Sequence, residues 1–259
     1  MPDVSAPVFH RYVALGDSFT EGVGDPDASR PNGVRGWADR VAEVLATRTD
    51  DFGYANLAIR GRTLRPIVEQ QVEPALALGP DLVTIYAGGN DLLRPRLDVD
   101  SLAEVYDDAI GRLVAGGATV GLFTAFDPGV GGPFGRLRGR FAVYNEQVRE
   151  IAERHGAVVL DSWRMRPDDP TTVWSEDRLH LGPVGHQAVA IEVLNTLGVP
   201  HDLVALDPSM LTDHAPVRVG RRADFAWAVT HAAPWIRRRI TGRSSGDGVL
   251  PKRPQLLPI

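Results

Sequence analysis

Residues 11–22 read Arg-Tyr-Val-Ala-Leu-Gly-Asp-Ser-Phe-Thr-Glu-Gly, an apolar run that ends at a glycine and passes directly into polar residues. An apolar run of this length, bounded by Gly16, is typical of a buried strand. Runs of the same kind recur four times along the chain, at 53–58, 81–87, 118–124 and 157–160. The sequence therefore predicts five short strands, of which the first is followed at once by Asp17 and Ser18.

Segments with helical periodicity separate the predicted strands. Apolar residues recur at helical spacing in four places, at 37–45, 102–113, 141–152 and 184–194. Pro183 stands at a favoured first helical position, and Gly116 and Gly198 stand at favoured stop positions. Strands that alternate with helices predict βαβ units, and hence an α/β fold with a parallel sheet covered on both faces.

Polar and glycine residues follow three of the predicted strands. Ligands bind beyond the carboxyl ends of the strands in such sheets, so these residues are candidates for a site. Ser18 follows the first strand and could act as an exposed nucleophile, with its own N–H free to meet an oxyanion. Gly61 and Asn90, after the second and third strands, could supply further N–H donors. The alternatives are a helix or turn cap at Ser18, a loop glycine at Gly61 and an Asx-turn at Asn90.

A base for Ser18 must titrate near neutrality, and histidine is the usual choice. His180 has Asp177 three residues before it, placed to orient the other ring nitrogen, although a lone loop histidine is often only a hydrogen-bonded surface residue. His186 lacks such a carboxylate, and we assign it to packing or capping. The spacing of these histidines is not a recognised metal-ligand spacing, so no metal is expected.

Composition excludes several classes of protein. Hydrophobic residues make up 43% of the chain and charged residues 24%, which is ordinary globular composition. The net charge of −5 argues against a nucleic-acid binder, and the absence of cysteine excludes thiolate catalysis and disulfides. No leader or membrane-spanning run is seen, so we expect a cytoplasmic protein. Lys252 is the only lysine, which indicates mainly a coding bias. No phosphate-binding or dinucleotide motif occurs, which removes the usual sequence signatures of nucleotide binding.

Residues 242–246, Gly-Arg-Ser-Ser-Gly, match the G-x-S-x-G pattern of a nucleophile elbow. That motif requires a strand before the serine and a helix after it. Here it follows a predicted helix and precedes a proline-rich stretch. We therefore reject it as a nucleophile site.

Taken together, four segments resemble the SGNH hydrolase superfamily, the GDSL-type esterases and lipases. The matching segments are Gly-Asp-Ser-Phe-Thr-Glu-Gly around Ser18, Asn-Leu-Ala-Ile-Arg-Gly-Arg-Thr around Gly61, Gly-Gly-Asn-Asp around Asn90, and Asp-Arg-Leu-His ending at His180. They stand in the family's order, and the likeness covers about residues 10–198. Phe19 replaces the leucine of the family's name-giving motif, a common variation.

The resemblance implies a flavodoxin-like three-layer α/β/α sandwich with a five-stranded parallel sheet, and ester hydrolysis without a cofactor or metal. Ser18 would be the nucleophile, His180 the base and then the acid, and Asp177 the residue that orients the imidazole. The N–H groups of Ser18 and Gly61 with the Asn90 side chain would form the oxyanion hole. The substrate would be a small acyl ester. An acyltransferase with the same triad and a non-catalytic binding module are the alternatives.

We predict a hydrolase domain at 1–200 and an Arg-rich helical extension at 201–259 with a Gly/Ser/Pro-rich tail. The extension holds nine basic residues against five acidic ones. Its predicted helix, from about 221, would pack on the main domain through Phe225, Trp227 and Trp235. The less favoured interpretation is a membrane contact through the arginines at 237–239. We expect the pocket walls to come from loops 24–36 and 126–138.

Overall fold

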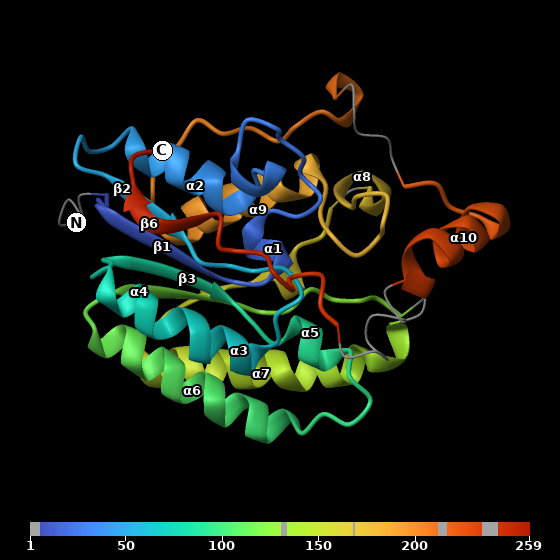
Figure 1. The fold of residues 1–259 in the computed structure, drawn as a ribbon, viewed down its shortest axis with the longest axis horizontal. Helices are drawn as coiled ribbons and strands as arrows, with labels where there is room; N and C mark the ends of the chain where they lie inside the picture. Colours follow the sequence, from blue (N-terminus) through green and yellow to red (C-terminus); the bar gives the residue numbers. More distant parts are fainter. Residues whose placement is uncertain (1–5, 131–133, 168, 212–216, 235–242) are drawn as a thin grey trace.

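The computed structural model describes residues 6–130, 134–167, 169–211, 217–234 and 243–259. Its described part contains a six-stranded sheet with the order β5-β4-β3-β1-β2-β6 (Figure 1). The strands are β1 Arg11–Gly16, β2 Gly53–Asn56, β3 Leu82–Tyr86, β4 Thr119–Phe123, β5 Val158–Leu160 and β6 Arg253–Leu257. The first five pair in parallel, whereas β6 pairs antiparallel with β2.

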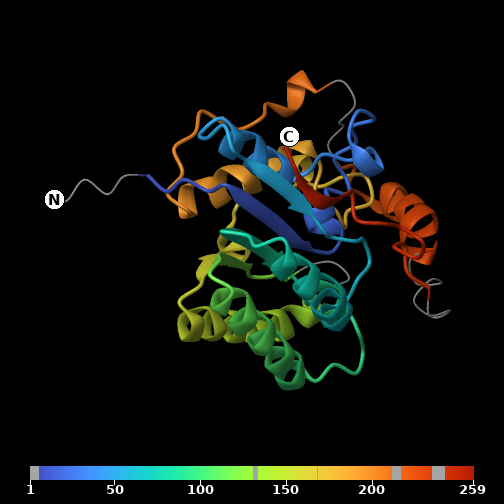
Figure 2. The same cartoon turned by 60° about the vertical axis from the view of Figure 1, so that its left-hand side comes forward.

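Helices cover both faces of the sheet, which makes the three-layer α/β/α arrangement expected from the sequence (Figures 1 and 2). One face carries α2 and α9, and the other carries α3, α4, α6 and α7. The longer helices are α2 Trp37–Ala46, α6 Val99–Ala115, α7 Arg138–His155 and α9 Pro183–Thr196. The shorter ones are α1 Ser18–Glu21, α3 Leu64–Ile67, α4 Glu73–Ala77, α5 Gly89–Leu92, α8 Pro170–Val173 and α10 Arg221–Trp227. A π-helical turn at Val68–Val72 joins α3 to α4.

The central strand β1 supplies side chains to both apolar cores. Val13 and Leu15 belong to the core under α3, α6 and α7, and Tyr12 and Ala14 belong to the core under α2 and α9. All four are fully buried. A strand covered on both faces has no polar side, which is why this segment reads as a continuous apolar run.

Strand β6 lies in the tail, for which the sequence indicates only a Gly/Ser/Pro-rich composition. Tyr54 pairs with Leu257 and Asn56 with Arg253, so the tail closes the β2 edge of the sheet. Pro254 lies within β6, and proline is tolerated in an edge strand because no outer neighbour needs its missing N–H. The expected five-stranded parallel sheet is present, with one antiparallel strand added to it. The division at residue 200 stays a prediction.

Lys252, directly before β6, is buried with only 5% of its surface exposed. Its Nζ lies 2.9 Å from the Asp39 carboxylate and donates to the Arg35 carbonyl at 2.6 Å. The Tyr54 hydroxyl donates to the same carboxylate at 2.8 Å. Burial lowers the pKa of Lys252 and raises that of Asp39, and their mutual attraction opposes both shifts. The single lysine therefore fastens the tail to α2.

The helix of the extension packs differently from the prediction. Phe225 is 73% exposed, so its expected burial against the main domain is wrong. Trp227 does make contact: its Nε1 donates to the Asp177 carbonyl at 2.7 Å, and the Arg178 guanidinium lies over its ring. Polar contacts dock α10, which is why an apolar stripe was a poor guide. Trp235 and the arginines at 237–239 lie outside the described residues.

None of the helices in the described ranges is long and apolar enough to cross a membrane.

Replacing Lys252 with methionine should lower the free energy of unfolding by about 3–5 kcal/mol, because the Asp39 carboxylate is left buried without its cation. Adding Asp39→Asn should restore much of that loss, since the amide is neutral and still accepts from Tyr54. Denaturant unfolding of the two variants measures both effects. A Lys252→Met protein as stable as the parent would show that the pair does not fasten the tail.

Candidate active site

Ser18 is the first residue of α1, two residues beyond the end of β1. Gly16 turns the chain with a φ of +146°, and a Cβ there would lie 2.6 Å from the Tyr86 carbonyl oxygen, so only glycine fits. The Asp17 side chain caps α1 by accepting the Phe19 N–H at 3.0 Å. Among the described residues, the Ser18 N–H has no hydrogen-bond acceptor. Ser18 thus presents both a hydroxyl and an N–H at the carboxyl edge of the sheet.

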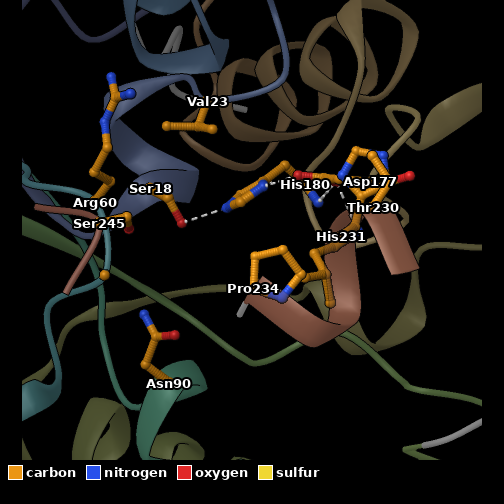
Figure 3. A pocket seen from close by; sticks show the side chains of 12 residues that line it. Ser18, Val23, Arg60, Asn90, Asp177, His180, Thr230, His231, Pro234 and Ser245 are labelled. Carbon is orange, nitrogen blue, oxygen red and sulfur yellow. Dashed lines mark hydrogen bonds and ion pairs between the residues drawn. The ribbon is translucent and has the colours of Figure 1, made fainter. Parts of the chain in front are cut away.

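His180 reaches Ser18 from the loop that precedes α9. Its Nε2 lies 3.0 Å from Ser18 Oγ, although 162 residues separate the two along the chain (Figure 3). Gly24, just after α1, allows this approach, because any side chain there would collide with the Leu181 carbonyl. Its φ of +100° also favours glycine. Backbone contact between the two loops therefore sets the Ser18–His180 distance.

Asp177 holds the other ring nitrogen of His180. Its Oδ2 lies 2.5 Å from His180 Nδ1, and its Oδ1 accepts the backbone N–H groups of Leu179 and His180, both at 2.9 Å. The Ser175 hydroxyl adds a bond of 2.7 Å. Burial acts to raise the pKa of Asp177, but these bonds and the nearby imidazole outweigh it and hold the pKa well below its ordinary value. The carboxylate is therefore charged at neutral pH and fixes the ring orientation.

Gly61 and Asn90 complete the set of residues named from the sequence, and both line the same cavity as Ser18 and His180. Gly61 adopts a φ of +75°, and within the described part of the chain its N–H has no hydrogen-bond acceptor. Asn90 Nδ2 donates to Asp17 Oδ2 at 2.9 Å and to the Arg62 carbonyl at 3.0 Å. The structure thus brings all five residues together, but the Asn90 amide already serves two protein acceptors.

The Asp17 carboxyl group beneath Asn90 is almost fully buried, with 3% of its surface exposed. Burial raises its pKa to about 7, and the hydrogen bonds from Phe19 and Asn90 only partly offset this. Asp17 and Asp177 lie at one site with pKa values shifted in opposite directions. Such a separation is typical of functional sites.

His186 has a structural position, as assigned from the sequence. It is fully buried, its Nδ1 accepts the Trp37 N–H at 3.2 Å, and its Nε2 lies 3.3 Å from the Val23 carbonyl. Burial lowers its pKa to about 4, so the ring is neutral at physiological pH. It joins α9 to the start of α2. Within the described ranges, no group of three or more His, Cys, Asp or Glu residues could hold a metal ion.

The cavity over Ser18 has a volume of about 310 Å³ (Figure 3). Its described lining comprises Ser18, Val23, Arg60, Gly61, Asn90, Asp177, Leu179, His180, Thr230, His231, Pro234 and Ser245. No described residue of loops 24–36 and 126–138 is among them, and residues 131–133 lie outside the described part of the chain, so their contribution to the pocket walls stays a prediction. Residues of the extension line the cavity, because α10 docks on the loop that carries Asp177.

Residues 14–188 match the model of the GDSL-like Lipase/Acylhydrolase family, which is more than half of the chain. The chain belongs to this family. The resemblance to SGNH hydrolases seen in the four sequence segments is thereby confirmed. Residues 201–259 lie outside the matched region of this acylhydrolase.

Solved structures share the acylhydrolase's fold. LAE5, an α/β hydrolase from the metagenome of Lake Arreo, Spain, is 22% identical with a TM-score of 0.62, covering 74% of this chain and 97% of that chain. TesA is 21% identical with a TM-score of 0.58, over 72% and 97% of the two chains. Axe2, an acetylxylan esterase from Geobacillus stearothermophilus, is 20% identical with a TM-score of 0.58, over 74% and 95%. No curated protein matches the sequence significantly.

Sequence reasoning missed several residues that hold this acylhydrolase's site in place. Buried Gln71 makes two bonds to Gly16, donating to its carbonyl at 2.9 Å and accepting its N–H at 2.8 Å. Asp91 accepts the Leu64 N–H at 2.8 Å, which ties the Asn90 segment to the chain that follows Gly61. Asp91 stands within the quoted motif and could have been singled out. Nothing local marks Gln71, because its partner lies 55 residues away.

Asp17→Asn tests the raised pKa of Asp17. An acid whose pKa rises from 3.8 to about 7 on folding makes the protein less stable as the pH increases through that interval. Between pH 5 and pH 8 the parent should lose roughly 2–3 kcal/mol that the neutral asparagine variant does not lose. Melting temperatures of both proteins at several pH values measure the difference.

Asp50→Asn removes an exposed carboxyl group and provides the matched control, whose stability should change with pH as that of the parent does. A stability difference between Asp17→Asn and the parent that is the same at pH 5 and pH 8 would contradict the assignment.

Proposed function

We propose that this acylhydrolase is a serine esterase that cleaves small carboxylic esters through an acyl-enzyme on Ser18. The observation that carries the proposal is the chain of contacts from Ser18 Oγ to His180 Nε2 at 3.0 Å and from His180 Nδ1 to Asp177 Oδ2 at 2.5 Å. The nucleophile, its base and the carboxylate that orients the base are all within hydrogen-bond reach. Axe2, the acetylxylan esterase that shares this fold, agrees with the proposal.

In the first step, Ser18 Oγ attacks the ester carbonyl carbon while His180 Nε2 takes the hydroxyl proton. Asp177 favours the tautomer with the proton on Nδ1, which leaves the Nε2 lone pair toward Ser18, and it stabilises the imidazolium that forms. Breakdown of the tetrahedral intermediate expels the alcohol oxygen, which receives the proton from His180. In the second step, a water molecule attacks the carbonyl carbon of the acyl-enzyme while His180 takes its proton. The acid is then released as Ser18 Oγ leaves and receives that proton from His180.

Three hydrogen-bond donors around Ser18 would stabilise the oxyanion. The N–H groups of Ser18 and Gly61 are the first two, since neither is used within the described part of the chain. The third is Asn90 Nδ2, which would share the hydrogen now donated to Arg62 or to Asp17. Preorganised donors of this kind usually provide the largest single contribution to acyl-transfer catalysis.

The volume of the cavity, about 310 Å³, lies at the small end of the range for ligand pockets. We therefore expect esters with short acyl groups to be the better substrates. An acyl-chain series of p-nitrophenyl esters, with and without added alcohols, determines the preferred length and whether water or an alcohol accepts the acyl group.

Ser18→Ala should abolish hydrolysis of p-nitrophenyl acetate, because no other group in the proposed mechanism can form the acyl-enzyme. The parent should be labelled covalently by a fluorophosphonate at Ser18, and the variant should not. The measurements are initial rates and mass spectrometry of the labelled protein. A variant as active as the parent overturns the proposed function.

Asn90→Ala should lower kcat by roughly 10²–10³, as for the loss of a single oxyanion donor. KM should change little, because the donor acts mainly in the transition state. Since Asn90 also bonds to Asp17 and Arg62, a melting curve must accompany the kinetics. A well-folded variant with less than about a threefold loss in kcat would remove Asn90 from the oxyanion hole.

A further inference from the structure

Residues 243–257 run from the active-site cavity to the edge of the sheet. We call this segment the C-terminal strap. Its first part is a tight turn in which Asp247 Oδ2 accepts the Ser244 N–H at 2.9 Å and Ser244 Oγ accepts the Gly246 N–H at 3.1 Å. Its last part is β6. The strap lies outside the residues matched by the family model.

Gly246 seats the strap on the loop that carries Gly61. It is buried, and a Cβ at this position would collide with the Arg60 carbonyl and lie 2.9 Å from Ile59 Cγ2. The strap backbone therefore touches the backbone of the residue immediately before Gly61. Only a residue without a side chain allows so close an approach.

Further along, three contacts hold the strap in this position. Asn32 Nδ2 donates to the Leu250 carbonyl at 3.1 Å, Lys252 is buried against Asp39, and β6 pairs with β2. A short turn fixed at one end by close packing and at the other by a sheet edge has little freedom to leave the site.

This anchoring places two serine hydroxyls above Gly61. A Cβ at Gly61 would collide with Ser244 Oγ and lie 2.9 Å from Ser245 Oγ. Ser244 is engaged by the turn, whereas Ser245 lines the cavity beside Ser18 (Figure 3). Among the described residues, the Ser245 hydroxyl has no hydrogen-bond partner. The guanidinium of neighbouring Arg60 bonds to the carboxylate of Glu21, so it does not compete for the same space.

We propose that Ser245 is a substrate-binding residue, whose hydroxyl donates a hydrogen bond to the ester carbonyl oxygen alongside the Gly61 N–H. The inference rests on the proposed function, because it assumes that the carbonyl oxygen lies on the Gly61 side of Ser18. The strap holds the Gly61 loop and adds a donor to it. Ser245 stands at the position after the motif serine, Ser244, in the G-x-S-x-G match at 242–246, so the segment would serve the site without supplying its nucleophile.

Ser245→Ala should lower kcat/KM for p-nitrophenyl acetate about tenfold to a hundredfold, less than a buried donor because the hydroxyl is exposed to water. Most of the loss should appear in kcat, and Ser245→Thr, which keeps the hydroxyl, should recover much of it. Ser209→Ala removes an exposed hydroxyl of the extension that lies outside the cavity lining, and it should leave the rates unchanged. Melting temperatures of all three variants should stay within a few degrees of the parent.

Gly246→Ala tests the seating of the strap separately. The added methyl group would push the turn away from Arg60, and kcat/KM should fall at least tenfold while β6 and the Lys252 contact keep the protein folded. In Gly246→Ala the further change Ser245→Ala should cost much less than in the parent, because the hydroxyl is already displaced. Additive losses would mean that the turn does not position Ser245.

The outcomes separate this inference from the proposed function. If Ser18→Ala is inactive and Ser245→Ala lies within twofold of the parent, Ser245 does not bind the ester and the esterase proposal stands. If Ser18→Ala keeps its activity, the proposed function itself fails.

Discussion

The parallel pairing of β1 with β2 and β3 is the constraint on which the site depends. Val13 lies opposite Ala55 in β2 and opposite Val83 in β3, so the three strands end at one edge of the sheet. The chain leaves that edge three times, and each exit carries one of the groups named from the sequence. Ser18, Gly61 and Asn90 are therefore neighbours because of backbone hydrogen bonding, before any side chain makes a contact.

The parts of the structure that could be predicted are those in which a short stretch of sequence indicates how its residues are buried in the fold. The apolar run at 12–15 reflects burial on both faces of the sheet, and the polar residues after Gly16 reflect the open edge of the sheet. His180 was placed by chemical need and a nearby carboxylate, and the structure brings it to Ser18. The contact that makes this possible, between Gly24 and the Leu181 carbonyl, has no signature that sequence reasoning could use.

The C-terminal region could not be predicted, because its contacts are long-range and polar. Strand β6 is short, contains a proline and pairs with residues about 200 positions earlier. The single lysine, Lys252, indicates only a coding bias in the sequence, and only the fold shows the Asp39 carboxylate that permits its burial. Phe225 suggested a buried apolar stripe, whereas α10 is held by Trp227 and Arg178. Hydrophobic periodicity indicates which face of a helix is buried, but it does not reveal a single polar contact that holds the helix in place.

The two carboxyl groups at the site differ in charge, and each suits the charge that the proposed chemistry would develop on its side of Ser18. Asp177 accepts four hydrogen bonds and stays ionised, so it favours the imidazolium that forms on His180. Asp17 lies on the side of Asn90, where negative charge would develop on the ester oxygen. A full charge there would repel the oxyanion, but burial raises the pKa of Asp17 to about 7, so the carboxyl is often neutral near physiological pH. In the proposed mechanism, hydrogen bonding thus keeps Asp177 charged beside His180, where a cation would form, and desolvation lowers the negative charge of Asp17 beside Asn90, where the oxyanion would form.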